Sequence, residues 1–101
     1  MNVGIYNIRI QCFGLTDEKL QKFYDFLNEK GIMDKYMQLI KDGEDIATLV
    51  ESMTDELDDL LEENYWIYSY IDYCADSREI PFWMGKERIA EAIIDDLIGG
   101  N

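Results

Sequence analysis

Residues 44–73 decide the predicted fold and read EDIATLVESMTDELDDLLEENYWIYSYIDY. In the first part, residues 44–63, apolar side chains recur every three or four positions, which is the spacing of one face of an α-helix. These apolar positions are Ile46, Leu49, Val50, Met53, Leu57, Leu60 and Leu61. At 100° per residue they fill an arc of about 120°. We therefore predict a long amphipathic helix that buries this face and turns its acidic residues toward water.

The second part, residues 65–73, is compatible with two structures. Its aromatic and β-branched residues are typical of a β-strand. Helical spacing through Tyr68, Ile71 and Ala75 would instead continue the preceding helix into one very long helix. We predict the strand, because it would also supply a pairing partner for the N-terminal segment, and keep the helix as the alternative.

The N-terminal residues 3–13 alternate between apolar and polar side chains, as a half-buried strand does. The residues on the predicted buried face are Tyr6, Ile8, Ile10 and Cys12. Those on the wet face are Asn7, Arg9 and Gln11. The predicted fold is therefore α+β: a small antiparallel sheet of residues 3–13 and 65–73, packed against three or four helices in a single domain over residues 1–101. An essentially all-α fold is the alternative.

Three further helices are predicted from local signals. The first follows Thr16 as N-cap and stops at Gly31, with Leu20, Phe23, Tyr24 and Leu27 as its buried stripe. The second covers about residues 34–41. The last covers about residues 86–98 and follows an extended apolar segment, residues 80–84, that contains the single proline.

Two cysteines, Cys12 and Cys74, lie far apart in the sequence and outside any paired motif. We expect them to be reduced, half-buried thiols. The first four residues lack the basic and apolar regions of a signal peptide, and no apolar run approaches about 18 residues. The predicted location is the cytoplasm, which would be that of the host cell if the protein is encoded by a phage.

Net charge is the most unusual property of the chain. Of the formal net charge of −13, residues 42–77 supply −12, because they hold twelve acidic residues and no lysine or arginine. Such a segment repels the phosphates of nucleic acids and anionic membranes. We expect neither as a direct ligand. The charge predicts instead a partner with a basic surface, above all a nucleic-acid-binding protein such as a nuclease or an effector complex.

Catalytic and cofactor sites are not predicted. The chain has no histidine, the commonest general base and metal ligand, and its glycines lie mostly at predicted helix ends rather than in a phosphate-binding loop. One enzyme alternative stays open, since carboxylates three and four residues apart on helices can hold Mg²⁺. All-helical nucleotide pyrophosphohydrolases of the MazG type hold Mg²⁺ in this way, so a small MazG-like enzyme is the alternative. That chemistry requires inward-facing carboxylates, whereas the acids of residues 44–63 lie opposite the apolar stripe.

The acidic face of residues 44–63 has two features that a merely soluble surface does not need. Like charges stand one turn apart, as in Glu51 with Asp55 and Asp59 with Glu63, and each such pair costs a few tenths of a kcal/mol. Glu62 and Glu63 also lie at the negative end of the predicted helix dipole, and Asp95 with Asp96 repeats this placement in the last helix. Together these unfavourable placements indicate that the charge serves a partner.

In its small size, acidity and aromatic content, the chain resembles the DNA-mimic inhibitors by which phages block restriction enzymes or CRISPR effectors. It is similar in the same respects to immunity proteins that neutralise basic nuclease toxins. The resemblance implies a non-enzymatic inhibitor of the anti-restriction or anti-CRISPR kind. The residues predicted to bind the partner are Glu51, Asp55, Glu56, Asp58, Asp59, Glu62, Glu63, Trp66, Tyr68, Tyr70 and Asp72. Phe82 and Trp83 are candidates for a homodimer contact.

Overall fold

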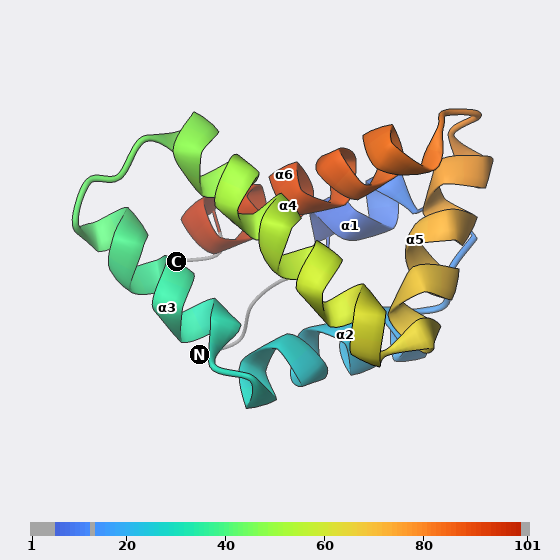
Figure 1. Cartoon of the computed structure of the whole chain (residues 1–101), viewed down its shortest axis with the longest axis horizontal. Helices are drawn as coiled ribbons and strands as arrows, with labels where there is room; N and C mark the ends of the chain where they lie inside the picture. Colours follow the sequence, from blue (N-terminus) through green and yellow to red (C-terminus); the bar gives the residue numbers. More distant parts are fainter. Residues whose placement is uncertain (1–5, 13, 100–101) are drawn as a thin grey trace.

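A computed structural model describes residues 6–12 and 14–99, and all regular secondary structure in these ranges is α-helical (Figure 1). The fold is all-α, so the predicted antiparallel sheet is wrong and the all-α alternative is right. The helices are α1 (Tyr6–Gln11), α2 (Asp17–Glu29), α3 (Ile32–Lys41), α4 (Ile46–Glu63), α5 (Tyr65–Ser77) and α6 (Phe82–Gly99).

Helix α6 lies at the centre of the arrangement. It packs against α1, α3, α4 and α5, and in Figure 1 α4 crosses in front of it while α5 stands at one end. Its buried residues include Ile89, Ile93, Ile94 and Leu97, which form the middle of the hydrophobic core. Within the described ranges, no helix is long and apolar enough to cross a membrane.

The predicted N-terminal strand is a helix over its described part, α1; residues 3–5 and 13 lie outside the described residues. Ile8 and Cys12, four positions apart, are buried, whereas Ile10 is exposed, which is the pattern of a helix and not of a strand. The carboxylate of Asp96 in α6 accepts a hydrogen bond of 3.2 Å from the backbone N–H of Asn7. This contact satisfies one of the free N–H groups at the start of α1. A residue 89 positions away therefore stabilises the helix, and local alternation could not reveal it.

The second predicted strand, residues 65–73, lies inside α5. Its buried residues, Ile67, Ile71, Cys74 and Ala75, have helical spacing and face the core. Aromatic residues favour strands only weakly, and burial of an apolar face overrides that preference. The helix is not a continuation of α4, because Asn64 interrupts the two with φ −133° and ψ 83°.

Local capping signals predicted the other helices well. The Thr16 hydroxyl accepts a hydrogen bond of 3.3 Å from the backbone N–H of Lys19 at the start of α2, as predicted. Gly31 follows that helix with φ +75°, in the left-handed region that glycine adopts readily. Helix α6 begins at Phe82, directly after Pro81, so the prediction of an extended segment over residues 80–84 is wrong for residues 82–84. Proline is tolerated there because an N–H group at the start of a helix has no hydrogen-bond partner within the helix, so its absence costs little.

The two cysteines form a disulfide that joins the end of α1 to α5. Both side chains are buried, and 62 positions separate them in the sequence. The expectation of two reduced thiols is therefore wrong. Sequence spacing could not predict the bond, because the packing of α1 and α5 brings the two residues together.

Candidate partner-binding surface

The seven acidic residues along the outer side of α4 form a surface that we call the acidic ridge. Its members are Glu51, Asp55, Glu56, Asp58, Asp59, Glu62 and Glu63. Six of them are exposed and Glu56 is half-buried, while Leu49, Met53, Leu57 and Leu60 on the other side of the helix are buried. The predicted buried stripe is wrong at Ile46, which is exposed in the first turn. The ridge thus faces solvent along the whole second half of α4.

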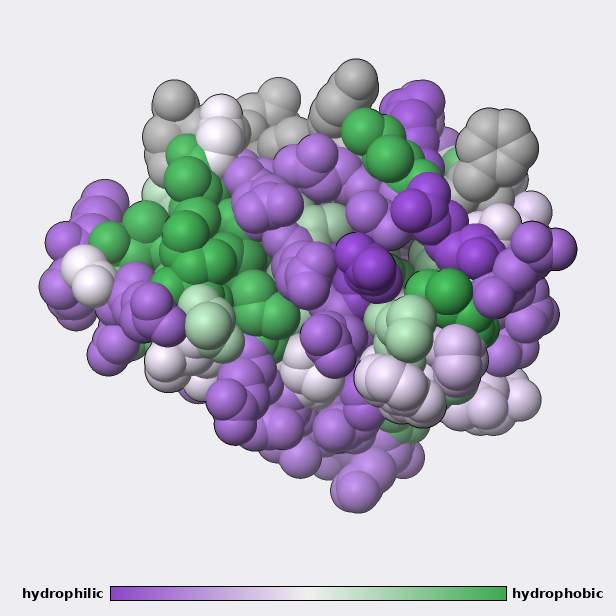
Figure 2. Space-filling view, turned by 90° about the horizontal axis from the view of Figure 1, so that it is seen from above, coloured by the Kyte–Doolittle hydropathy of each residue, from purple (hydrophilic) through white to green (hydrophobic). Residues whose placement is uncertain are grey.

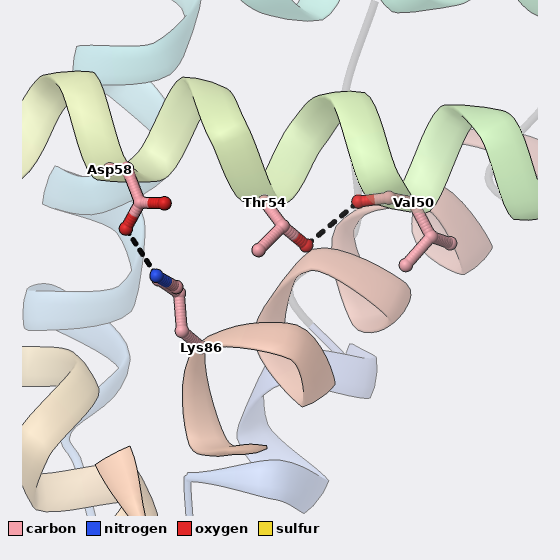
Figure 3. A network of polar contacts seen from close by, with 4 residues as sticks. All are labelled: Val50, Thr54, Asp58 and Lys86. Carbon is pink, nitrogen blue, oxygen red and sulfur yellow. Dashed lines mark hydrogen bonds and ion pairs between the residues drawn. The ribbon is translucent and has the colours of Figure 1, made fainter. Parts of the chain in front are cut away.

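Two lysines contact the ridge from the neighbouring helices. On the α3 side, the Nζ atom of Lys35 lies 2.6 Å from a carboxylate oxygen of Glu56. On the α6 side, Lys86 binds the carboxylate of Asp58, and its side chain is largely buried (Figure 3). In the described part of the chain, the other five ridge carboxylates have neither an ion pair nor a hydrogen bond.

The charge density of the ridge can be compared with that of DNA. Seven carboxylates less the two contacting lysines leave a formal charge of −5. Residues 51–63 span roughly 18 Å at a rise of 1.5 Å per residue. The ridge therefore carries about one net charge per 3.6 Å, close to the one per 3.4 Å of a single DNA strand and half that of the duplex.

A hollow of about 250 Å³ lies between the ridge and α3. Tyr36 from α3 and Asp55, Glu56 and Asp59 from α4 line it. The Tyr36 side chain is fully buried, and its hydroxyl oxygen has no hydrogen-bond partner among the described residues. Burial raises the pKa of Tyr36, and the nearby Glu56 and Asp55 carboxylates raise it further. The hydroxyl is thus neutral and close to negative charge.

Trp66 and Tyr70, predicted to join the acidic residues, lie on another side of the molecule. The Trp66 ring packs edge-on against Phe26 of α2, with 5.3 Å between ring centroids, and the Nζ atom of Lys22 lies 4.6 Å above it. Both Trp66 and Tyr70 are half-buried and line a hollow of about 1090 Å³ along α2. The structure does not bring these two residues into the ridge.

Tyr68 and Asp72 occupy a different side of α5, toward the start of α6. The exposed Tyr68 ring stacks between Tyr65 and Phe82, with centroid distances of 5.5 and 4.6 Å. Asp72 is half-buried. A strand would have put Trp66, Tyr68, Tyr70 and Asp72 on one face, but the turn of 100° per residue separates them into two pairs. Tyr65, which was not among the predicted partner-binding residues, is 75% exposed.

The acids at the end of α6 have separate roles. Asp95 is exposed, but Asp96 is buried and accepts hydrogen bonds from the Tyr24 hydroxyl and the Asn7 backbone. Its position near the negative end of a helix therefore has a structural cause, and Asp96 gives no support for a partner surface. The placement of Glu62, Glu63 and the exposed Asp95 retains that meaning.

An apolar patch lies left of the centre of the molecule seen from above (Figure 2). Ile46, in the first turn of α4, is exposed and lines a hollow of about 450 Å³. Among the residues that the structure describes, no group of three or more His, Cys, Asp or Glu side chains could hold a metal ion.

Comparison of the chain with protein-family models, with curated proteins and with solved structures gave no match.

Proposed function

We propose that this protein is a non-enzymatic inhibitor that presents the acidic ridge to a basic nucleic-acid-binding protein. The most specific form of the proposal is phage-type anti-restriction or anti-CRISPR action. One observation carries it: five ridge carboxylates project from one rigid helix, and no cation of the described residues forms an ion pair with them. A groove that evolved to bind a nucleic-acid backbone would attract such an array of anions.

Repulsion within the ridge destabilises the isolated protein. Each uncompensated like-charge pair along the ridge costs a few tenths of a kcal/mol, and an acid in the last turn costs about 0.3–1 kcal/mol. Lys35 and Lys86 offset this repulsion only at the two sides of the ridge. Binding to a cationic surface would relieve the rest, and the same field would accelerate association at low salt.

The test reverses three unpaired ridge acids and leaves the ion pair of Asp58 intact. Affinity capture from bacterial lysate compares wild type with the triple variant Glu51→Lys, Asp55→Lys and Glu62→Lys. The control variant has the same change in net charge. In it, lysine replaces three exposed acids outside the ridge, Glu18, Glu29 and Asp76.

We expect wild type and the control to retain a basic nucleic-acid-binding protein that rising salt releases, and the ridge variant to lose it. Retention by the ridge variant would contradict the proposal. The identity of the protein that wild type captures would distinguish inhibition of a restriction enzyme or CRISPR effector from neutralisation of a nuclease toxin.

A further inference from the structure

The hollow between α3 and α4 combines an acidic wall with a buried polar atom that lacks a partner. Asp55 and Asp59 stand one helical turn apart on its rim, and neither has a protein partner in the described chain. Tyr36 also lines the hollow, and its hydroxyl is shielded from solvent and close to the Glu56 and Asp55 carboxylates. An unpaired buried hydroxyl costs about 1–3 kcal/mol. A protein that needed Tyr36 only as a core residue would be at least as stable with phenylalanine there.

The hollow already holds a cation from the protein itself. The Lys35 ammonium bonds Glu56 and lies 5.5 Å from the centroid of the Tyr36 ring. More than half of the Lys35 side chain is exposed, and an exposed ion pair of this kind contributes at most about 1 kcal/mol. A stronger cationic group could therefore displace Lys35 at small cost.

We propose that this hollow binds the guanidinium group of an arginine from the partner protein, an inference that rests on the proposed function. The planar guanidinium has five N–H donors, so that it can serve the Asp55 and Asp59 carboxylates and the Tyr36 oxygen together. A lysine ammonium is a compact point charge with three donors, and matches such a spread of acceptors less well. The arginine site adds one specific contact to the ridge, which otherwise attracts the partner only through its density of negative charge.

The test uses a defined probe, the peptide acetyl-Gly-Arg-Gly-amide, with lysine and uncharged citrulline peptides as controls. Titration of the ¹⁵N-labelled protein is followed by NMR. We expect shifts confined to the hollow, with binding of the arginine peptide at least fivefold tighter than that of the lysine peptide. The citrulline peptide should give no shifts. Shifts spread evenly along α4, or equal binding of arginine and lysine, would overturn the proposal.

Two substitutions in the hollow and one on the ridge separate this site from general charge attraction. Tyr36→Phe keeps the charge and removes the unpaired hydroxyl, so it should fold at least as stably and bind the arginine peptide at least fivefold more weakly. Asp59→Asn should weaken peptide binding more than Glu62→Gln, which removes the same charge outside the hollow. Unchanged peptide binding by Tyr36→Phe, or equal losses in the two neutralised variants, would contradict an arginine site.

Although the arginine site rests on the proposed function, the failure of one can be told from the failure of the other. If the hollow variants retained the protein captured from lysate while the triple ridge variant lost it, the arginine site would be refuted and the inhibitor proposal would stand. If the triple ridge variant also retained its partner, both would fail.

Discussion

The hydroxyl of Tyr24 donates a hydrogen bond of 2.5 Å to the carboxylate of Asp96, which joins α2 to α6 inside the core. The same carboxylate accepts from the Asn7 backbone and so holds α1 as well. Asp96 is 5% exposed, and among the described residues it is the only acidic residue that is buried. Three helices thus meet at one side chain.

This junction should make stability depend on pH. Burial raises the pKa of Asp96 above its ordinary value of 3.8, although the bonds from Tyr24 and Asn7 oppose the shift. Between 3.8 and the higher native pKa, the folded state holds a proton that the unfolded state has released. The contribution of Asp96 to stability must therefore fall as pH rises through this interval.

Urea unfolding of wild type and Asp96→Asn, measured from below pH 3.8 to neutrality, isolates that contribution. The wild-type advantage over the variant should decline with rising pH and then level off above the native pKa. An advantage that grew with pH would mean that hydrogen bonding, and not burial, controls the titration.

Gly85 should be intolerant of alanine because α5 and α6 meet there without space for a side chain. A Cβ atom added to Gly85 would lie 2.6 Å from the Cβ of Ala75. We expect Gly85→Ala to lower the free energy of unfolding by about 1–3 kcal/mol, as overpacked cores do. Gly99→Ala, at the end of the same helix, should be neutral or stabilising, because none of the described residues would lie within 4 Å of the added Cβ atom. Combining Ala75→Gly with Gly85→Ala should recover part of the lost free energy of unfolding. If nothing were recovered, the clash with Ala75 would not be the cause of the loss.

Reduction of the disulfide should weaken the fold. The bond between Cys12 and Cys74 closes a loop of 62 positions, and loop-closure entropy for that length corresponds to about 4 kcal/mol. Thermal unfolding with and without a dithiol reductant should show a lower Tm when the bond is broken. The double variant Cys12→Ser, Cys74→Ser should not respond to the reductant. A wild-type Tm that ignored complete reduction, verified by thiol titration, would contradict a stabilising role.

Glu63→Lys should stabilise the isolated protein. The substitution removes an acid from the last turn of α4 and places a lysine four residues after Asp59, which is a favourable pair. The expected gain is about 0.5–1.5 kcal/mol at low salt, decreasing as salt rises. Glu18→Lys, in the first turn of α2, is the matched control and should have the opposite sign. Equal effects at the two positions would show that net charge, and not the helix dipole, determines stability.

The sequence predicted those helices whose signals are local. Thr16 and Gly31 mark the ends of α2, and apolar spacing predicted α4 with its acidic face outward. The prediction was wrong at α1 and α5, where the deciding contacts join residues far apart, such as Asn7 with Asp96. The same limit applies to the hollow. The apolar stripe of α3 places Tyr36 in the core, but only the packing of α4 puts its hydroxyl beside carboxylates.

The central claim is that the acidic ridge competes with nucleic acid for a basic protein surface. Its most direct test is a titration of fluorescent duplex DNA against the protein captured from lysate, with this chain present at increasing concentration and at several salt concentrations. We predict that the chain displaces the duplex, that displacement weakens as salt rises, and that the triple ridge variant displaces none. Simultaneous binding of the duplex and the chain, or equal displacement by the ridge variant, would contradict the claim.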